Sequence, residues 1–275
     1  MKRIILYVIV LTFISAGLTK GQLPSDEVPG IIEKLYGRLL TNLNDNDRLR
    51  INDSIKSIIE SYVTSDTVFT HRFSNLRYLG QITSSDSLLK IITWNLVLSN
   101  NQGRYFCYLI RKSLHGEDNI IYKLTGNYNA NPILTDTIYV QSDWYGALYY
   151  DVKPFFTDNR QYWVLLGINY CNQLITRKII DVLSFTPENS ILFGRKWFDT
   201  GKQIKYREVF EYASNGVMSL RFNSENSIVF DHLVPISPSL TDEHQYYGSE
   251  YSYDAYNFQN GLWSLEINVD ARNRE

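Results

Sequence analysis

The sequence predicts a mainly β protein, in which an antiparallel meander (a barrel, a sandwich or a propeller-like array) follows an N-terminal helical hairpin. In residues 22–66, apolar side chains recur at three- and four-residue spacing, which is typical of helices that pack along one face. From about Val68 onward, short aromatic and β-branched runs alternate with Asn, Asp, Gly and Ser, the pattern of strands and hairpin turns. No long helical pattern separates these runs, which argues against a parallel α/β sheet.

Residues 1–21 match a secretory signal peptide. Two basic residues precede the apolar run 4–14, and small residues follow it. This run is too short to cross a bilayer, which requires roughly 20 apolar residues. We therefore expect cleavage near Gly21, with a cut after Gly17 as the alternative. The mature chain is expected in the periplasm or outside the cell, without a transmembrane span.

The helical hairpin divides at an Asn- and Asp-rich turn, 42–47. Ser25 or Asp26 is placed to cap the first helix, and Pro29 suits its first turn. Each helix carries one apolar stripe, formed by Val28, Ile31, Ile32, Leu35 and Leu39 in the first and by Ile51, Ile55, Ile58, Ile59 and Tyr62 in the second. Because such stripes need a covering partner, we expect both to pack on the β-domain, residues 67–275.

Within the β-domain, the predicted strands pair in sequence order across short turns. Two of these turns, Asn215–Gly216 and Asn260–Gly261, suit type I′ hairpins because both central residues of that turn need positive φ. The expected strands are 87–98 with 104–110, 146–156 with 162–168 followed by 175–185, 204–212 with 217–222, and 251–258 with 262–267.

Composition and motifs argue against several classes of function. The chain has 27 Lys and Arg against 29 Asp and Glu, and loss of residues 1–21 removes three of the basic ones. An acidic chain lacks the basic stripe of a nucleic-acid binder, so no such partner is expected. We expect no cofactor and no metal, because no phosphate-binding motif and no Cys/His spacing occurs. Cys107 and Cys171 either pair as a disulfide, if their Cα atoms lie within about 7 Å, or stay as thiols.

Several short segments, spread over most of the mature chain, carry a resemblance to known proteins. They are Lys90-Ile-Ile-Thr-Trp-Asn95, Trp144-Tyr-Gly-Ala-Leu-Tyr149, Lys178-Ile-Ile-Asp-Val-Leu183, Val209-Phe-Glu-Tyr212, Met218-Ser-Leu-Arg221, Ile228-Val-Phe-Asp-His-Leu233, Tyr246-Tyr-Gly248, Ser252-Tyr-Asp-Ala255 and Asp270-Ala-Arg-Asn273. Through them the chain resembles an uncharacterised family of exported Bacteroidota proteins, from which it departs at 167–172. The resemblance implies export and a shared fold, and it implies no activity and no catalytic residue.

Four triplets of Asp, a hydroxyl residue and an aliphatic residue look like the O-glycosylation signal of that phylum. They are Asp53-Ser54-Ile55, Asp66-Thr67-Val68, Asp86-Ser87-Leu88 and Asp136-Thr137-Ile138. Ordinary capping and turn chemistry explains each triplet equally well. Each triplet is therefore either an O-glycosylation signal or an ordinary cap or turn.

The candidate site residues are Trp144, Tyr145, Asp231, His232, Tyr253 and Asp254. Neighbouring residues on a strand point to opposite faces, so Asp231 and His232 do not pair with each other and a distant partner is required. Exposed aromatic side chains such as Trp144 and Tyr145 offer flat surfaces to sugars or peptides, although most aromatics of β proteins fill the core.

These observations predict an exported soluble module without enzymatic activity that binds a glycan, a peptide or an envelope protein. The common hydrolase and nucleotide-binding motifs are absent. One alternative is a periplasmic, glycan-directed hydrolase with paired carboxylates such as Asp231 and Asp254, since that chemistry leaves no local motif. Another is a structural protein of surface assembly.

Overall fold

The computed structural model describes residues 27–41, 43–74, 76–99, 102–113, 117–128, 131–170 and 172–270. The predicted signal peptide, its cleavage near Gly21 and the capping residues Ser25 and Asp26 lie outside these ranges. Within them, no helix is both long and apolar enough to span a membrane.

Two helices precede the sheets, as predicted. They are α1, Val28–Leu39, and α2, Asp45–Val63. α2 begins at Asn44, whose side chain accepts a hydrogen bond from the backbone N–H of Asp47 at 2.9 Å and so satisfies one of the unpaired donors of the first turn. Most of the expected stripe residues are buried, with Ile32 on α1 and Ile55 on α2 fully enclosed, whereas Ile31, Leu35 and Ile58 are half-buried.

The strands form three sheets. In spatial order, the first sheet contains β1 (Gly80–Thr83), β2 (Leu89–Val97), β3 (Gly103–Arg111) and β4 (Ile120–Asn127). The middle sheet contains β5 (Tyr139–Val140), β9 (Ile191–Phe193), β8 (Ile175–Phe185), β7 (Arg160–Tyr170) and β6 (Leu148–Thr157), and β12 (Glu208–Ala213) also pairs with β8. The third sheet contains β11 (Ile204–Lys205), β10 (Phe198–Asp199), β16 (Leu262–Val269), β15 (Tyr247–Gln259), β14 (Ser227–Pro235) and β13 (Leu220–Ser224).

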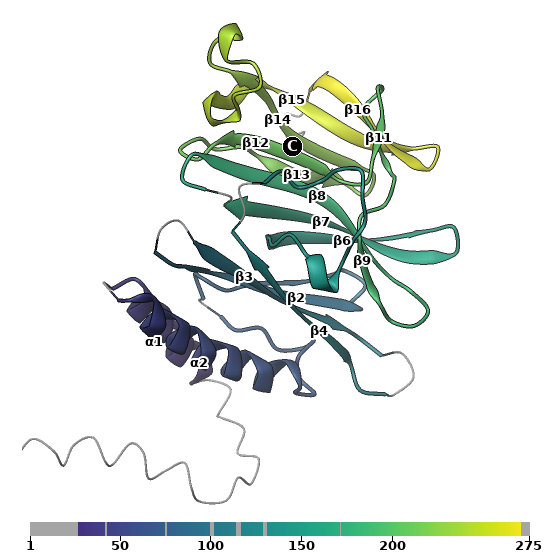
Figure 1. Ribbon diagram of the computed structural model, residues 1–275. Coiled ribbons are helices and arrows are strands. Elements are labelled where there is room, and N and C mark those ends of the chain that lie inside the picture. The colour runs from purple at the N-terminus through teal and green to yellow at the C-terminus, as the bar shows by residue number, and fades with distance from the viewer. Residues whose placement is uncertain are drawn as a thin grey trace, which may run out of the picture.

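Helices and sheets stack as four layers, visible from bottom to top in Figure 1. One core lies between the helices and the first sheet, a second between the first and middle sheets, and a third between the middle and third sheets. On β2, Trp94 faces the helices and Ile91 faces the middle sheet. The sequence of β2 is therefore a nearly continuous apolar run, because both faces of the strand are covered.

The order of pairing differs from a single meander. Strands 204–212 and 217–222 do not form a hairpin, because β12 pairs with β8 in the middle sheet while β13 pairs with β14 in the third. Tyr212 and Leu220 instead face each other across the third core. The Asn215–Gly216 turn accordingly has no positive φ, and it carries the chain from one sheet to another.

Two other turns have the geometry of type I′ hairpins. Asn260 and Gly261, between β15 and β16, have φ of 52° and 83°. Asp158 and Asn159, between β6 and β7, have φ of 50° and 57°. A further departure from the meander is β10, which pairs parallel with β16. Cys107 is a buried free thiol, and Cys171 lies outside the described residues.

Candidate functional site: the groove between β1 and β6

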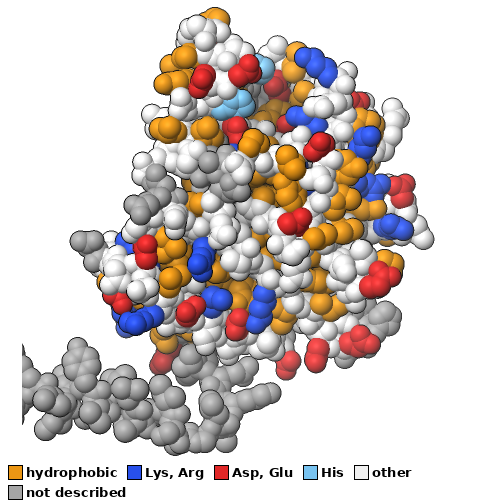
Figure 2. Space-filling view, viewed as in Figure 1, with side chains coloured by type: hydrophobic (Ala, Val, Ile, Leu, Met, Phe, Trp, Pro, Cys, Tyr) orange, Lys and Arg blue, Asp and Glu red, His pale blue; other side chains and the backbone are white. Residues whose placement is uncertain are grey.

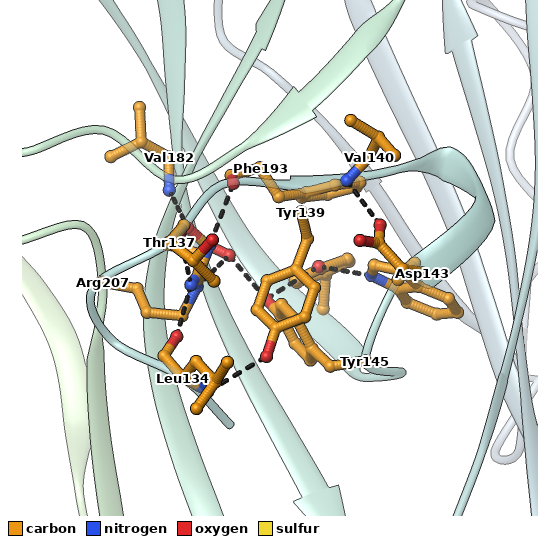
Figure 3. Close-up of polar contacts among 12 residues, drawn as sticks. Leu134, Thr137, Tyr139, Val140, Asp143, Tyr145, Val182, Phe193 and Arg207 are labelled. Atoms are coloured by element: carbon orange, nitrogen blue, oxygen red, sulfur yellow. Dashed lines mark hydrogen bonds and ion pairs between the residues drawn. The ribbon is translucent and has the colours of Figure 1, made fainter. Parts of the chain in front are cut away.

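Two of the predicted site residues lie in a polar network inside the protein (Figure 3). Trp144 is buried, and its Nε1 donates to the Tyr149 hydroxyl at 3.0 Å. The Tyr145 hydroxyl donates to Oδ2 of Asp181 at 2.8 Å. Burial raises the pKa of Tyr145 well above its usual value, so its hydroxyl stays protonated as a donor. The Trp144 ring thus offers no open face to a ligand.

The centre of this network is the ion pair of Arg207 and Asp181, two fully buried side chains. Arg207 Nε donates to Asp181 Oδ2 at 3.0 Å. Its two terminal nitrogens donate to the carbonyl oxygens of Leu134, Thr137 and Phe193. Burial raises the pKa of the Asp181 carboxyl, and the Arg207 charge opposes this shift. Arg207 therefore fastens the connection between β4 and β6 onto the middle sheet.

The other four predicted site residues lie near the middle of β14 and β15, on two faces of the third sheet. The register sets Phe230 opposite Asp254 and Asp231 opposite Tyr253, so Asp254 and Asp231 point to opposite sides of the sheet. His232 does have a distant partner, since its Nδ1 lies 2.7 Å from Asp254 Oδ2.

Each of these carboxylates also accepts a hydrogen bond from the backbone. Asp254 Oδ1 accepts from the backbone N–H of Asn268 at 3.1 Å, and Asp231 Oδ2 accepts from that of Ser219 at 2.8 Å. Each carboxylate therefore holds local backbone, and the two do not face a common cleft. In the part of the chain that the structure describes, no cluster of three or more His, Cys, Asp or Glu could hold a metal ion.

An open groove, missed in the sequence, lies where β1 at the edge of the first sheet approaches β6 at the edge of the middle sheet. It consists of two adjoining hollows of about 440 and 350 Å³. We call it the β1–β6 groove and define it by the side chains of Arg72, Arg77, Tyr78, Gln81, Thr93, Asn95, Tyr150 and Tyr170, with Lys90 and Asp151 at one end.

One wall of the groove is the segment between α2 and β1, which the first sheet holds in place. The buried side chain of Gln81 forms two hydrogen bonds of 3.1 Å with the backbone of Phe73, next to Arg72. Lys90 Nζ donates to the carbonyl oxygens of Val68 and His71, both at 2.6 Å. The wall is therefore fixed on both sides of Arg72.

Contacts with α1 position the other end of this wall. The backbone N–H of Arg77 donates to Glu33 Oε1 at 3.0 Å, which leaves the guanidinium group of Arg77 outside this contact. The Tyr78 ring packs on Tyr36, with 5.5 Å between ring centroids. Tyr78 is thus held at one edge of the groove while part of its ring stays exposed.

The charge of the groove is positive. Arg72 and Arg77 are exposed, and their guanidinium groups have no carboxylate partner among the described residues. Lys90 is buried, and its pKa is lowered to about 8 by burial and by the nearby Arg72 charge. Asp151 is the one carboxylate among the described residues of the lining. On the face shown in Figure 2, by contrast, basic and acidic side chains are interspersed.

One polar atom of the lining lacks a partner. Thr93 is buried, and no hydrogen bond to its Oγ1 occurs within the described residues. Gly80 lies directly opposite Thr93 in the sheet, where a Cβ atom would come 2.7 Å from this oxygen. The glycine therefore keeps open the space beside an unsatisfied hydroxyl.

A charge pattern in the sequence marks part of the groove. Residues 67–85 contain Arg72 and Arg77 and no Asp or Glu, in a chain with 29 acidic residues. The aromatic pair Tyr149–Tyr150 is a second signal, and Tyr150 lines the groove. The approach of β1 to β6 carries no local signal, because it depends on how two sheets stack.

Comparison with known proteins identifies no relative. No protein-family model, no curated protein and no solved structure matches the chain. The side chains of the β1–β6 groove are therefore the main indication of its ligand.

Proposed function

We propose that this protein is an exported module without enzymatic activity, and that it binds a glycan in the β1–β6 groove. One observation carries the proposal, namely three partly exposed tyrosines around one groove. Tyr78, Tyr150 and Tyr170 are 43%, 37% and 40% exposed, and all three line the larger hollow. Such rings are flat and apolar with a polar tip, which suits the faces and hydroxyl groups of sugars.

The size and polarity of the groove support the proposal. Hollows of about 440 and 350 Å³ fall within the range of small-ligand sites, about 300 to 1,000 Å³. The half-buried Asn95 adds an amide group to the lining of the larger hollow.

A glycan fits better than an added peptide strand. Cα atoms of β1 lie within 8 Å of Cα atoms of β6. A strand inserted between them would separate the two by about 9.6 Å, twice the usual strand spacing of about 4.8 Å. Recognition here is therefore by side chains and not by backbone pairing of a new strand.

The arrangement of carboxylates favours binding over hydrolysis. Glycoside hydrolysis uses two carboxyl groups about 5 to 10 Å apart across one cleft. Asp231 and Asp254 point to opposite faces of the third sheet, and the β1–β6 groove contains Asp151 alone. We therefore place the binding site in the groove and not at the six residues expected from the sequence.

Glycan binding to the purified protein tests the proposal, by array screening followed by titration calorimetry of the hits. Tyr170→Ala removes one ring of the groove and is expected to weaken binding about 3- to 10-fold, the contribution of one aromatic contact. The matched control is Tyr251→Ala, because Tyr251 is fully exposed on β15 and lies outside the groove. Absence of any glycan ligand, or equal weakening by both variants, would overturn the proposal.

Export is tested separately. Secretion in a bacterial host, followed by N-terminal sequencing of the secreted chain, is expected to give Gln22 as the first residue. A retained Met1 in the cytoplasmic fraction would refute export and leave the groove assignment standing.

A role in surface assembly is a second candidate, favoured by exposed apolar side chains on and beside the third sheet. Val217, Ile236 and Ile267 are all largely exposed, and Ser249 of β15 donates to the carbonyl oxygen of Val217. Exposed apolar groups of this kind occur at contact surfaces. Analytical ultracentrifugation distinguishes this role, because it requires stable oligomers.

A further inference from the structure

We propose further that the glycan bound in the β1–β6 groove is anionic, and that its carboxylate or sulfate groups are held by Arg72 and Arg77, with Lys90 at one end of the groove. This inference rests on the proposed glycan-binding function and names its ligand class. The groove presents three cationic side chains against the single carboxylate of Asp151. A concave surface with unbalanced charge concentrates ligands of the opposite sign.

Neither Arg72 nor Arg77 has a counter-charge among the described residues. Elsewhere in the protein, Arg177, Arg195 and Arg207 each form an ion pair with an Asp or Glu. Arg72 and Arg77 form none among the described residues, although both border the same hollow. A planar guanidinium group binds carboxylate and sulfate with two parallel hydrogen bonds, so both groups are available for a ligand.

Lys90 adds a positive charge at one end of the groove. Its Nζ donates to three neutral oxygens, those of Tyr62, Val68 and His71, each at 2.6 Å, and to no carboxylate. A buried ammonium group surrounded by neutral acceptors is stabilised by a nearby anion. The charged side chains near it are Arg72 from the wall and Asp151 from β6.

Thr93 supplies an independent indication of a ligand. Its Oγ1 is buried, unpartnered and part of the lining of the larger hollow. Buried hydroxyl groups are almost always hydrogen-bonded, so a partner for this one is expected from outside the described side chains.

Matched acidic and neutral ligands test the inference. Oligogalacturonate, its carboxyl-reduced galactan analogue and a sulfated galactan are titrated into the purified protein by calorimetry. We expect the acidic or sulfated chain to bind at least about 10-fold more tightly than the neutral one, since each charge-assisted hydrogen bond is about twice as strong as a neutral one. Added salt is expected to reduce this difference.

Charge variants locate the effect. Arg72→Gln and Arg77→Gln are each expected to weaken acidic binding about 3- to 10-fold and to leave neutral binding unchanged. The control is Arg160→Gln, which removes an exposed charge at a separate hollow beside β7 and β8 and is expected to change binding less than about twofold. Circular dichroism verifies the fold of each variant.

The outcomes separate the inference from the function on which it rests. Equal affinity for acidic and neutral chains, with Arg72→Gln and Arg77→Gln unchanged, overturns the inference and leaves glycan binding intact. Failure of every chain to bind overturns both. Equal binding of a polyglutamate peptide overturns the glycan assignment, because charge alone then suffices.

Discussion

Replacing Arg207 by Met tests whether the buried ion pair holds the middle sheet and its long connection together. The methionine fills part of the same space but leaves the Asp181 carboxylate buried without its counter-charge. It also removes the donors for the carbonyl oxygens of Leu134, Thr137 and Phe193.

The expected cost follows from these losses. Removing one partner of a buried ion pair costs about 3 to 5 kcal/mol. Each buried carbonyl left without a donor adds about 1 kcal/mol or more. Arg207→Met should therefore lower the free energy of unfolding by at least about 5 kcal/mol, a large part of the roughly 5 to 15 kcal/mol typical of a folded protein.

Urea unfolding followed by tryptophan fluorescence measures this change. The double variant Arg207→Met with Asp181→Leu should be less damaging than Arg207→Met alone, because no charge is then left unpaired. If Arg207→Met does not fold, Asp181→Asn provides a milder test, since the amide oxygen still accepts from Tyr145. A cost below about 1 kcal/mol for Arg207→Met, or additive costs in the double variant, would refute the reasoning.

Two further predictions concern the backbone and pH. Gly261→Ala, at φ 83°, should lower the free energy of unfolding by about 1 to 2 kcal/mol because side chains disfavour left-handed backbone. Gly248→Ala, with ordinary φ and open space, should lower it by less than about 0.5 kcal/mol. Equal melting temperatures of the two variants would contradict this prediction. The pKa of Lys90 in the folded state is about 8, below its ordinary value of 10.5. Between these two pH values the unfolded chain binds more protons than the folded chain. The free energy of unfolding should therefore rise with pH over this range. Urea titrations at several pH values detect this, and Lys90→Met should flatten the rise.

The local features of the fold were predictable from the sequence, and the stacking of its sheets was not. Helical stripes and the turns at 158–159 and 260–261 depend on neighbouring residues, which the sequence displays directly. The partner of β12 depends instead on the edge of β8, about 30 residues earlier. The hairpin predicted at Asn215–Gly216 was wrong, although the composition of the pair suits one. Tyr212 and Leu220 are buried on opposite sides of the third core, so the chain crosses between sheets here.

The site was predictable only in part for a similar reason. The sequence indicated that His232 needs a distant partner, and Asp254 is that partner. It did not decide whether Trp144 is buried, because aromatic residues of β proteins occur both in cores and on surfaces. The β1–β6 groove combines residues from a connecting segment, two strands of one sheet and one edge of another. No local sequence pattern therefore contains all of its residues.

The position of β16 has a consequence for how the chain acquires its structure during synthesis. β16 lies between β10 and β15 and supplies Trp263 to the third core. The third sheet therefore stays incomplete until residues 262–269 have left the ribosome. A premature stop near residue 260 would leave two unpaired strand edges and a gap in the middle of a sheet, a product prone to aggregation and degradation.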